Sequence, residues 1–210
     1  MNGLLIGIEG VDGSGKTVFA KALTDLLSGL GLRTVLTKEP GGTDFGKQLR
    51  KILQYRVEPI SAKAEYLLFA ADRAQHFTQV VIPSLQGGAI VVSDRTGDSS
   101  VAYQGYGRGL EIDMIKRVNQ WATDSVSPDI IIYLKIDLTT AQTRIKQRNE
   151  QPTVFEQEHL DFTQRLLDGF DELYQNRPEV LILDGKLPTN ELVTVAQQRI
   201  QILASKKGLI

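Results

Sequence analysis

Short apolar runs recur along the chain, and the longer segments between them carry apolar residues at helical spacing. Several of the short runs are apolar at consecutive positions, which is typical of strands buried on both faces of a sheet. The pattern predicts five strands, at residues 4–10, 33–39, 89–94, 129–136 and 180–185.

Helical segments separate these strands, including a long one over about residues 61–85. Strands that alternate with helices favour right-handed crossovers and a mostly parallel sheet with helices on both faces. We see no internal repeat, low-complexity tract or linker, so the sequence predicts one α/β domain over residues 1–210. Trp121 lies on an apolar helix stripe, and we expect it in the core.

Ligands of such sheets bind beyond the carboxyl ends of the strands. Applied to the predicted strands, this rule brings four segments to one edge of the sheet. They are residues 9–17, 38–43 and 94–104, and the turn after Leu183. The residues with chemically useful side chains fall in these same segments, so we expect the functional site at this edge.

Composition narrows the class of protein. The chain has 210 residues, of which 41% are hydrophobic and 23% charged, with a net charge of -1. The absence of a basic excess argues against a protein that coats nucleic acid. There are no cysteines, which excludes disulfides and thiolate metal sites. No apolar run approaches the roughly 20 residues of a membrane span, and no signal peptide is evident, so we expect a cytoplasmic protein.

The segment after the first strand reads GVDGSGKT and fits the pattern G-x-x-x-x-G-K-[ST], with a strand before it and a helix after it. Glycines let successive backbone N–H groups face an anion, and the following helix adds its positive dipole end. Lys16 can reach the β- and γ-phosphates of a nucleotide, and the Thr17 hydroxyl can join a Mg²⁺ shell. The predicted nucleotide-binding residues are Gly10, Val11, Asp12, Gly13, Ser14, Gly15, Lys16 and Thr17.

A second group of polar residues follows the third strand. Asp94 could hold the Mg²⁺ shell through water, and Arg95 offers a bidentate fork to the phosphate of an acceptor. A local surface salt bridge is the alternative for this pair. The chain has no Asn-Lys-x-Asp segment that would read guanine, so a GTP-binding switch protein is disfavoured.

Phe69 and Arg73 are four residues apart and share one face of the long predicted helix. Such a pair can stack on a base and donate a hydrogen bond to its edge. By spacing alone, a core phenylalanine and a solvated arginine are the more ordinary interpretation.

The segments EGVDGSGKT, KEPGGT, FAADRAQH and DRTGDSSVAYQG occur in the order and approximate spacing found in thymidylate kinases, over nearly the whole chain. The chain resembles the bacterial type of this family, and the last two segments discriminate more than the first. The resemblance implies a P-loop kinase fold with a small lid, and transfer of a phosphoryl group from ATP to dTMP with Mg²⁺. It also implies a homodimer, and the helix with Leu67, Leu68 and Ala71 fits either a partner interface or the core.

The resemblance assigns roles around the phosphates. Lys16 and Thr17 would serve ATP and Mg²⁺. Asp12 looks like the acid that contacts the deoxyribose 3′-hydroxyl. Arg95 would bind the dTMP phosphate, with Asp94 nearby on the metal side.

Around the base, Phe69 would stack on thymine and Arg73 would donate to its O4 atom. Ser100 and Gln104 resemble the residues at the N3 edge. Tyr103 resembles the ring packed where a ribose 2′-hydroxyl would sit.

Residues 39–43, beginning with Glu39, look like the loop over the monophosphate, with Arg50 a weaker candidate for the same phosphate. The attacking atom is already a phosphate oxygen, so no general base is required and catalysis can be positioning plus charge neutralisation. We therefore expect His76 and His159 to be surface or helix-packing residues.

The lid is predicted at about residues 144–160. Arg144 and Arg148 are one helical step apart and suit contact with adenine or phosphate. Many members of the family carry an Asp-Arg pair where this chain has Thr153 and Val154, so a solvated helix face is the alternative.

Two other functions remain open. A kinase of a deoxynucleoside would need a carboxylate to activate a sugar hydroxyl, and Glu9 is the obvious candidate; another (deoxy)nucleotide is a further possible acceptor. The altered lid also allows a non-catalytic P-loop nucleotide-binding module.

Overall fold

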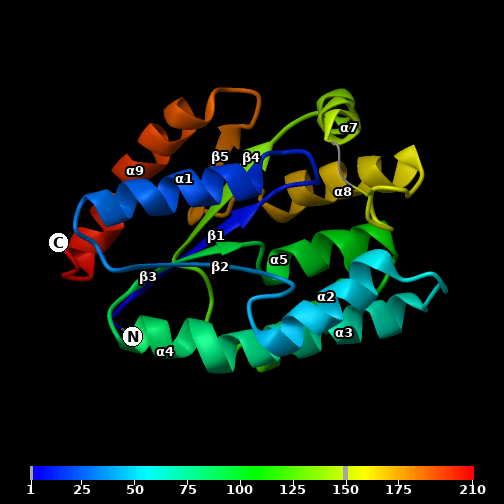
Figure 1. Cartoon of the computed structure of the whole chain (residues 1–210), viewed down its shortest axis with the longest axis horizontal. Coiled ribbons are helices and arrows are strands. Elements are labelled where there is room, and N and C mark those ends of the chain that lie inside the picture. The colour runs from blue at the N-terminus through cyan, green and yellow to red at the C-terminus, as the bar shows by residue number, and fades with distance from the viewer. Residues whose placement is uncertain (1, 149–150) are drawn as a thin grey trace.

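The computed structural model describes residues 2–148 and 151–210. The five predicted strands are present and form one all-parallel sheet in the order β2-β3-β1-β4-β5 (Figure 1). The strands are β1 (Leu4–Glu9), β2 (Thr34–Lys38), β3 (Ile90–Asp94), β4 (Ile130–Lys135) and β5 (Val180–Asp184).

Burial of the strands follows their place in the sheet. All six residues of β1 are buried, as are the first five of β4, and both strands were predicted from consecutive apolar residues. The edge strands β2 and β5 each leave exposed positions, such as Leu36 and Ile182. A strand with neighbours on both sides and helices on both faces has no polar face to offer, which explains the continuous apolar runs.

Helices cover both faces of the sheet. Figure 1 shows α1 and α9 together on one face, with α4 on the other. The long predicted helix is α3 followed by a π-helical segment, η1, and α4. The helices of the two faces are α1 (Lys16–Gly29), α9 (Thr189–Lys206), α3 (Ala62–His76), η1 (Phe77–Val81), α4 (Ile82–Gln86) and α8 (Leu160–Leu173).

Short elements complete the carboxyl edge of the sheet. They are α2 (Asp44–Tyr55), α5 (Gly97–Ser100), the π-helical segment η2 (Val101–Gly107), α6 (Ile112–Ala122) and α7 (Leu138–Gln147). Polar side chains start two of them: the Thr43 hydroxyl accepts from the Gly46 N–H, and the Asp137 carboxylate accepts from the Thr140 N–H. These caps fix the points at which the chain leaves the loops of the site.

Trp121 is a correction to the sequence analysis, because 82% of its surface is exposed. Helix α6 buries Ile115, whereas Met114 and Trp121, seven residues apart, share the outward face. Residues at this spacing lie on the same side of a helix, and an apolar side can face outward as well as inward. None of the described helices is long and apolar enough to cross a membrane.

Candidate active site

The phosphate loop lies between the end of β1 and the start of α1. Gly13 and Gly15 both have positive φ, 84° and 94°, in the region that favours glycine. A Cβ on Gly13 would also lie 2.7 Å from the Ala141 carbonyl oxygen, so the close packing of the loop requires glycine there. Lys16 is buried, and its Nζ donates to the Val11 carbonyl at 2.8 Å. Burial, with Arg95 nearby, lowers the pKa of Lys16 to about 8.

Thr17 and Asp94 come together across the sheet. The register of the parallel strands places Asp94 opposite Ile8, and the Thr17 hydroxyl donates to Asp94 Oδ2 at 2.6 Å. A hydroxyl and a carboxylate beside a phosphate loop are the kind of oxygen ligands that Mg²⁺ takes from protein while keeping several waters. This pair fits the metal that the sequence analysis predicted.

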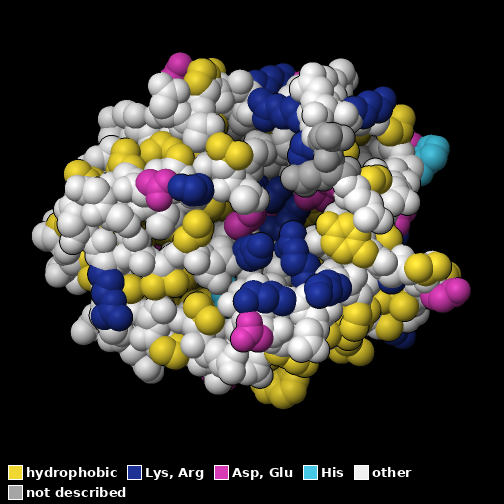
Figure 2. Space-filling view, viewed as in Figure 1, with side chains coloured by type: hydrophobic (Ala, Val, Ile, Leu, Met, Phe, Trp, Pro, Cys, Tyr) yellow, Lys and Arg dark blue, Asp and Glu magenta, His cyan; other side chains and the backbone are white. Residues whose placement is uncertain are grey.

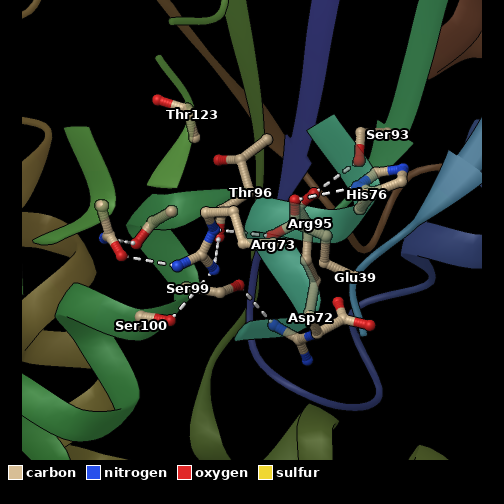
Figure 3. Close-up of polar contacts among 12 residues, drawn as sticks. Glu39, Asp72, Arg73, His76, Ser93, Arg95, Thr96, Ser99, Ser100 and Thr123 are labelled. Atoms are coloured by element: carbon tan, nitrogen blue, oxygen red, sulfur yellow. Dashed lines mark hydrogen bonds and ion pairs between the residues drawn. The ribbon is translucent and has the colours of Figure 1, made fainter. Parts of the chain in front are cut away.

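Arg95 lies directly after β3 and contacts both the phosphate loop and α5. Its Nη2 donates to the Asp12 carboxylate and to the Tyr103 hydroxyl. Its Nη1 donates to Ser99 Oγ at 2.9 Å (Figure 3). Its φ is 78°, in the left-handed region that is costly for a residue with a Cβ. Burial raises the pKa of Asp12, but Arg95 and Lys16 outweigh this and hold it below its usual value.

Glu9 holds the backbone that follows Arg95. It is fully buried, and its carboxylate accepts from the Thr96 N–H at 2.7 Å, the Thr96 hydroxyl at 2.8 Å and the Ser99 hydroxyl at 2.6 Å. Burial raises the pKa of Glu9 to about 7, even though Arg95 acts in the opposite direction. The sequence analysis considered Glu9 only as a base and missed this positioning role, since nothing local links it to residues 96–99.

Arg73 is not a solvated arginine, because only 1% of its surface is exposed. Its Nε donates to Glu39 at 2.8 Å and its Nη1 to Asn119 Oδ1 at 2.6 Å. Its Nη2 donates to Ser100 Oγ at 3.1 Å and to the Thr96 carbonyl at 3.3 Å (Figure 3). These contacts use four of the five N–H donors of the guanidinium and fix its plane.

A narrow cavity is lined by Arg73 and by the other residues that were predicted to contact the base. The predicted acceptor residues that line this base cavity are Asp12, Glu39, Phe69, Arg73, Arg95, Ser100, Tyr103 and Gln104. Phe155 of the lid also lines it, with its ring centroid 5.9 Å from that of Phe69 and 5.8 Å from that of Tyr103. The sequence analysis missed Phe155, because an isolated phenylalanine in a polar segment gives no sign of distant aromatic neighbours.

The loop after β2 is held by a buried polar cluster. Glu39 Oε1 lies 3.0 Å from His76 Nδ1 (Figure 3). His76 Nε2 lies 2.6 Å from the Thr37 hydroxyl. His76 is fully buried, so it is not a surface residue, and its role is to hold Glu39 as well as to pack α3. Burial raises the pKa of Glu39, but Arg73 and His76 reverse this and lower it. His159 is exposed, as predicted.

A larger cleft with a volume of about 560 Å³ adjoins the base cavity. Asp12, Glu39 and Arg95 line both, so they stand where the two meet. Figure 2 shows lysine and arginine side chains gathered in a hollow of this face. The predicted residues that line the cleft are Asp12, Gly13, Gly15, Lys16, Thr17, Glu39, Arg50, Asp94, Arg95, Arg144 and Arg148. Gly10, Val11 and Ser14 are buried behind it.

The lid residues differ from the expected arrangement in one respect. Helix α7 ends at Gln147, so Arg148 lies past the helix and is not one helical step from Arg144. Arg144 Nη1 donates to the Gly185 carbonyl at 2.8 Å, beside the phosphate loop, whereas Arg148 pairs with Glu156. Residues 149–150 of the predicted lid lie outside the described residues.

The chain is similar to known proteins over most of its length. A sequence model of the thymidylate kinase family matches residues 8–195. A thymidylate kinase of Halothermothrix orenii is 40% identical, over 91% of this chain and 93% of its own. Others from Dehalococcoides mccartyi and Desulfovibrio desulfuricans are 42% and 35% identical, over at least 95% of both chains. With the phosphate loop, the base cavity and the cleft between them, these similarities show that the chain belongs to the thymidylate kinase family.

Proposed function

We propose that this chain is a dTMP kinase, which transfers the γ-phosphoryl group of ATP to dTMP and gives dTDP and ADP for dTTP synthesis. Membership of the thymidylate kinase family supports this function. The observation that carries the proposal for the site is that the base cavity and the cleft meet at Asp12 and Arg95. An acceptor bound in the cavity would thereby present its phosphate to a donor bound in the cleft.

On the donor side, Lys16 would neutralise the transferring phosphate, and the positive φ of Gly13 and Gly15 shapes the loop that would surround it. Thr17 and Asp94 would hold Mg²⁺, Asp94 through water. Mg²⁺ held there would supply positive charge to offset that of the transferring phosphate. The proposed ATP-binding residues are Gly10, Val11, Asp12, Gly13, Ser14, Gly15, Lys16, Thr17, Arg144 and Arg148.

On the acceptor side, Arg95 would bind the dTMP phosphate and Asp12 the 3′-hydroxyl. Arg73 is supported as the donor to O4 by its burial and by its one remaining N–H. Tyr103 would leave no room for a ribose 2′-hydroxyl. The proposed dTMP-binding residues are Asp12, Glu39, Arg50, Phe69, Arg73, Arg95, Ser100, Tyr103 and Gln104.

The attacking dTMP phosphate needs no base, so Lys16, Arg95 and Asp12 would act by positioning and by neutralising charge. A deoxynucleoside kinase is less well supported, because Glu9, its candidate base, is fully buried and already accepts three hydrogen bonds. The non-catalytic alternative rested on Thr153 and Val154, and the arginines of the lid still line the cleft.

The proposal includes a single nucleoside monophosphate kinase domain over residues 1–210, with the lid at about 144–160, working in the cytoplasm where ATP and dTMP are used. We also propose that two copies of the chain form a homodimer. Leu67 and Ala71 of α3 and Met114 and Trp121 of α6 are exposed, and the two helices pack together. Exposed apolar residues on adjacent helices are typical of a face that binds another protein surface.

The test is an ADP-release assay with Mg·ATP and, in parallel, dTMP, thymidine or no acceptor. ADP release that depends on dTMP is expected. Release with thymidine alone would favour the deoxynucleoside kinase, and no stimulation by either acceptor would favour the non-catalytic module.

A further inference from the structure

Glu65, near the start of α3, is a buried carboxylate on which four hydrogen-bond donors converge. Only 1% of its surface is exposed. Its Oε1 accepts from Gln104 Nε2 at 3.0 Å and from Arg108 Nε at 3.2 Å. Its Oε2 accepts from Arg56 Nη2 at 2.7 Å and from Arg108 Nη2 at 3.2 Å.

This contact fixes which way the Gln104 amide points. A carboxylate between two guanidinium groups only accepts, whereas a glutamine amide has a donating end and an accepting end. Gln104 must therefore turn Nε2 toward Glu65 and Oε1 away from it. The reverse orientation would set two acceptors against each other in a buried place, with no proton between them. Gln104 itself is buried and lines the base cavity.

The fixed orientation matters because of what bases present at their edges. Thymine has a donor at N3 and an acceptor at O4, whereas cytosine has an acceptor at N3 and an amino donor at the next position. A cavity with the Oε1 acceptor of Gln104 and a spare N–H of Arg73 complements thymine at both positions. It opposes cytosine at both.

We propose that Glu65 is a positioning residue that selects thymine over cytosine by holding the Gln104 amide in one orientation. The inference rests on the proposed function, since it takes dTMP as the acceptor. Glu65 contacts Gln104 and not the base, so its effect is on the choice between acceptors. A residue that merely stabilised the fold would change the use of both acceptors alike.

The experiment is to measure kcat/KM for dTMP and dCMP with the wild type and with Glu65→Gln. An amide at position 65 can donate as well as accept, so Gln104 is free to turn either end to the base. The ratio of dTMP to dCMP efficiency is expected to fall about tenfold or more. Calorimetric binding of the two monophosphates without ATP should show the same change, independently of turnover. An unchanged ratio would overturn the proposal.

Glu158→Gln is the matched control. Glu158 pairs with the same arginine, Arg108, from the lid side, and among the described residues Gln104 donates to Glu65 and not to Glu158. This variant loosens the ion network and is expected to leave the ratio unchanged. An equal fall in the ratio for Glu158→Gln would assign the effect to the network and overturn the role of the amide.

Gln104→Met keeps the test decisive if Glu65→Gln fails to fold, because it leaves Glu65 with both arginines. The ratio is expected to fall in this variant too, and an unchanged ratio would again overturn the proposal. A wild type that does not phosphorylate dTMP would refute the proposed function instead. An active wild type whose ratio resists these substitutions would refute the present inference alone.

Discussion

Arg95 donates through Nη2 to the Asp12 carboxylate, and this ion pair joins the end of β3 to the phosphate loop. Both residues line the base cavity and the cleft. Each residue of the pair acts on the other. Asp12 holds the guanidinium where the base cavity meets the cleft. Arg95 in turn lowers the pKa of Asp12, against the effect of burial, and so keeps it ionised. A phosphate entering there would meet an arginine that is already oriented.

Replacing Arg95 should therefore weaken the binding of dTMP far more than the binding of ATP. We expect Arg95→Ala to raise KM for dTMP by at least tenfold and to change KM for ATP little. We propose that this guanidinium binds the acceptor phosphate, in exchange for protein contacts that now occupy both of its terminal nitrogens. Arg95→Lys keeps a charge but not the fork, and should recover only part of the loss. Steady-state kinetics with each substrate varied in turn measures this. A raised KM for ATP with an unaffected KM for dTMP would show that Arg95 binds ATP and not dTMP, contrary to the proposal.

Lys16→Ala should abolish most turnover. Removing one preorganised donor to developing charge typically lowers kcat by about 10²–10³, and Lys16 is buried at the centre of the loop. Lys21→Ala is the control, since Lys21 lies on the same helix but is exposed and pairs with Asp25. Near-normal kcat for Lys16→Ala would contradict the assignment of the phosphate loop.

The sheet and its edge could be predicted because they depend on local signals. Consecutive apolar residues identified β1 and β4, and the rule for parallel sheets then placed Asp12 and Arg95 at the same edge. Their ion pair joins residues 83 positions apart, as the predicted fold requires.

Contacts between distant elements could not be predicted in the same way. Trp121 looked like a core residue because helical spacing defines a stripe but not what covers it. The contacts of Phe155 with Phe69 and of Glu65 with Gln104 form only when the lid and η2 pack against α3. No local sequence pattern encodes that packing. Arg73 could be judged buried only once Glu39 and Asn119 were placed around it.

The stability of the protein should carry a pH-dependent contribution from Glu9. Its pKa is raised from 4.5 to about 7, chiefly by burial, so between these values the unfolded chain releases a proton that the folded protein keeps. The contribution of Glu9 to the free energy of unfolding is therefore complete below pH 4.5 and is lost as the pH rises to about 7. Glu9→Gln imitates the protonated form and cannot titrate.

Denaturant unfolding of the wild type and Glu9→Gln at pH 5 and pH 8 measures this contribution. The wild type should lose stability relative to the variant between the two values, and the comparison cancels the other titrating groups. A difference that stays constant, or that grows in favour of the wild type at pH 8, would mean that Glu9 is ionised in the folded protein.

The two lid arginines should differ in their effect on turnover. Arg144 contacts Gly185 beside the phosphate loop, so Arg144→Ala should lower kcat about tenfold or more. Arg148 is engaged by Glu156, and Arg148→Ala should lower kcat less. Lys146→Ala is the control, because Lys146 is exposed on the same helix and lies outside the cleft lining. Normal kcat for both arginine variants, with the protein folded, would show that the lid supplies no catalytic charge.

The choice of base should depend on Arg73. Its spare N–H suits the O4 acceptor of thymine or uracil and opposes the amino group of cytosine. An unpaired buried polar group costs about 1–3 kcal/mol, and more when charge is involved. One methyl group in an apolar pocket gives only about 1–3 kcal/mol of selectivity. The wild type should therefore use dUMP less well than dTMP, and dCMP hardly at all.

Substitution of Arg73 should reduce the preference for dTMP over dCMP more than the preference for dTMP over dUMP, because the arginine does not read the methyl group. Arg73→Ala also deprives the buried Glu39 of its arginine partner and leaves it only His76, so thermal unfolding must accompany the kinetics. Arg73→Lys is the companion variant: it keeps a charge beside Glu39 but loses the fixed fork. Measuring kcat/KM for the three monophosphates with each protein decides the matter. Equal use of dCMP and dTMP by the wild type would contradict the assignment of Arg73 and, with it, the choice of substrate.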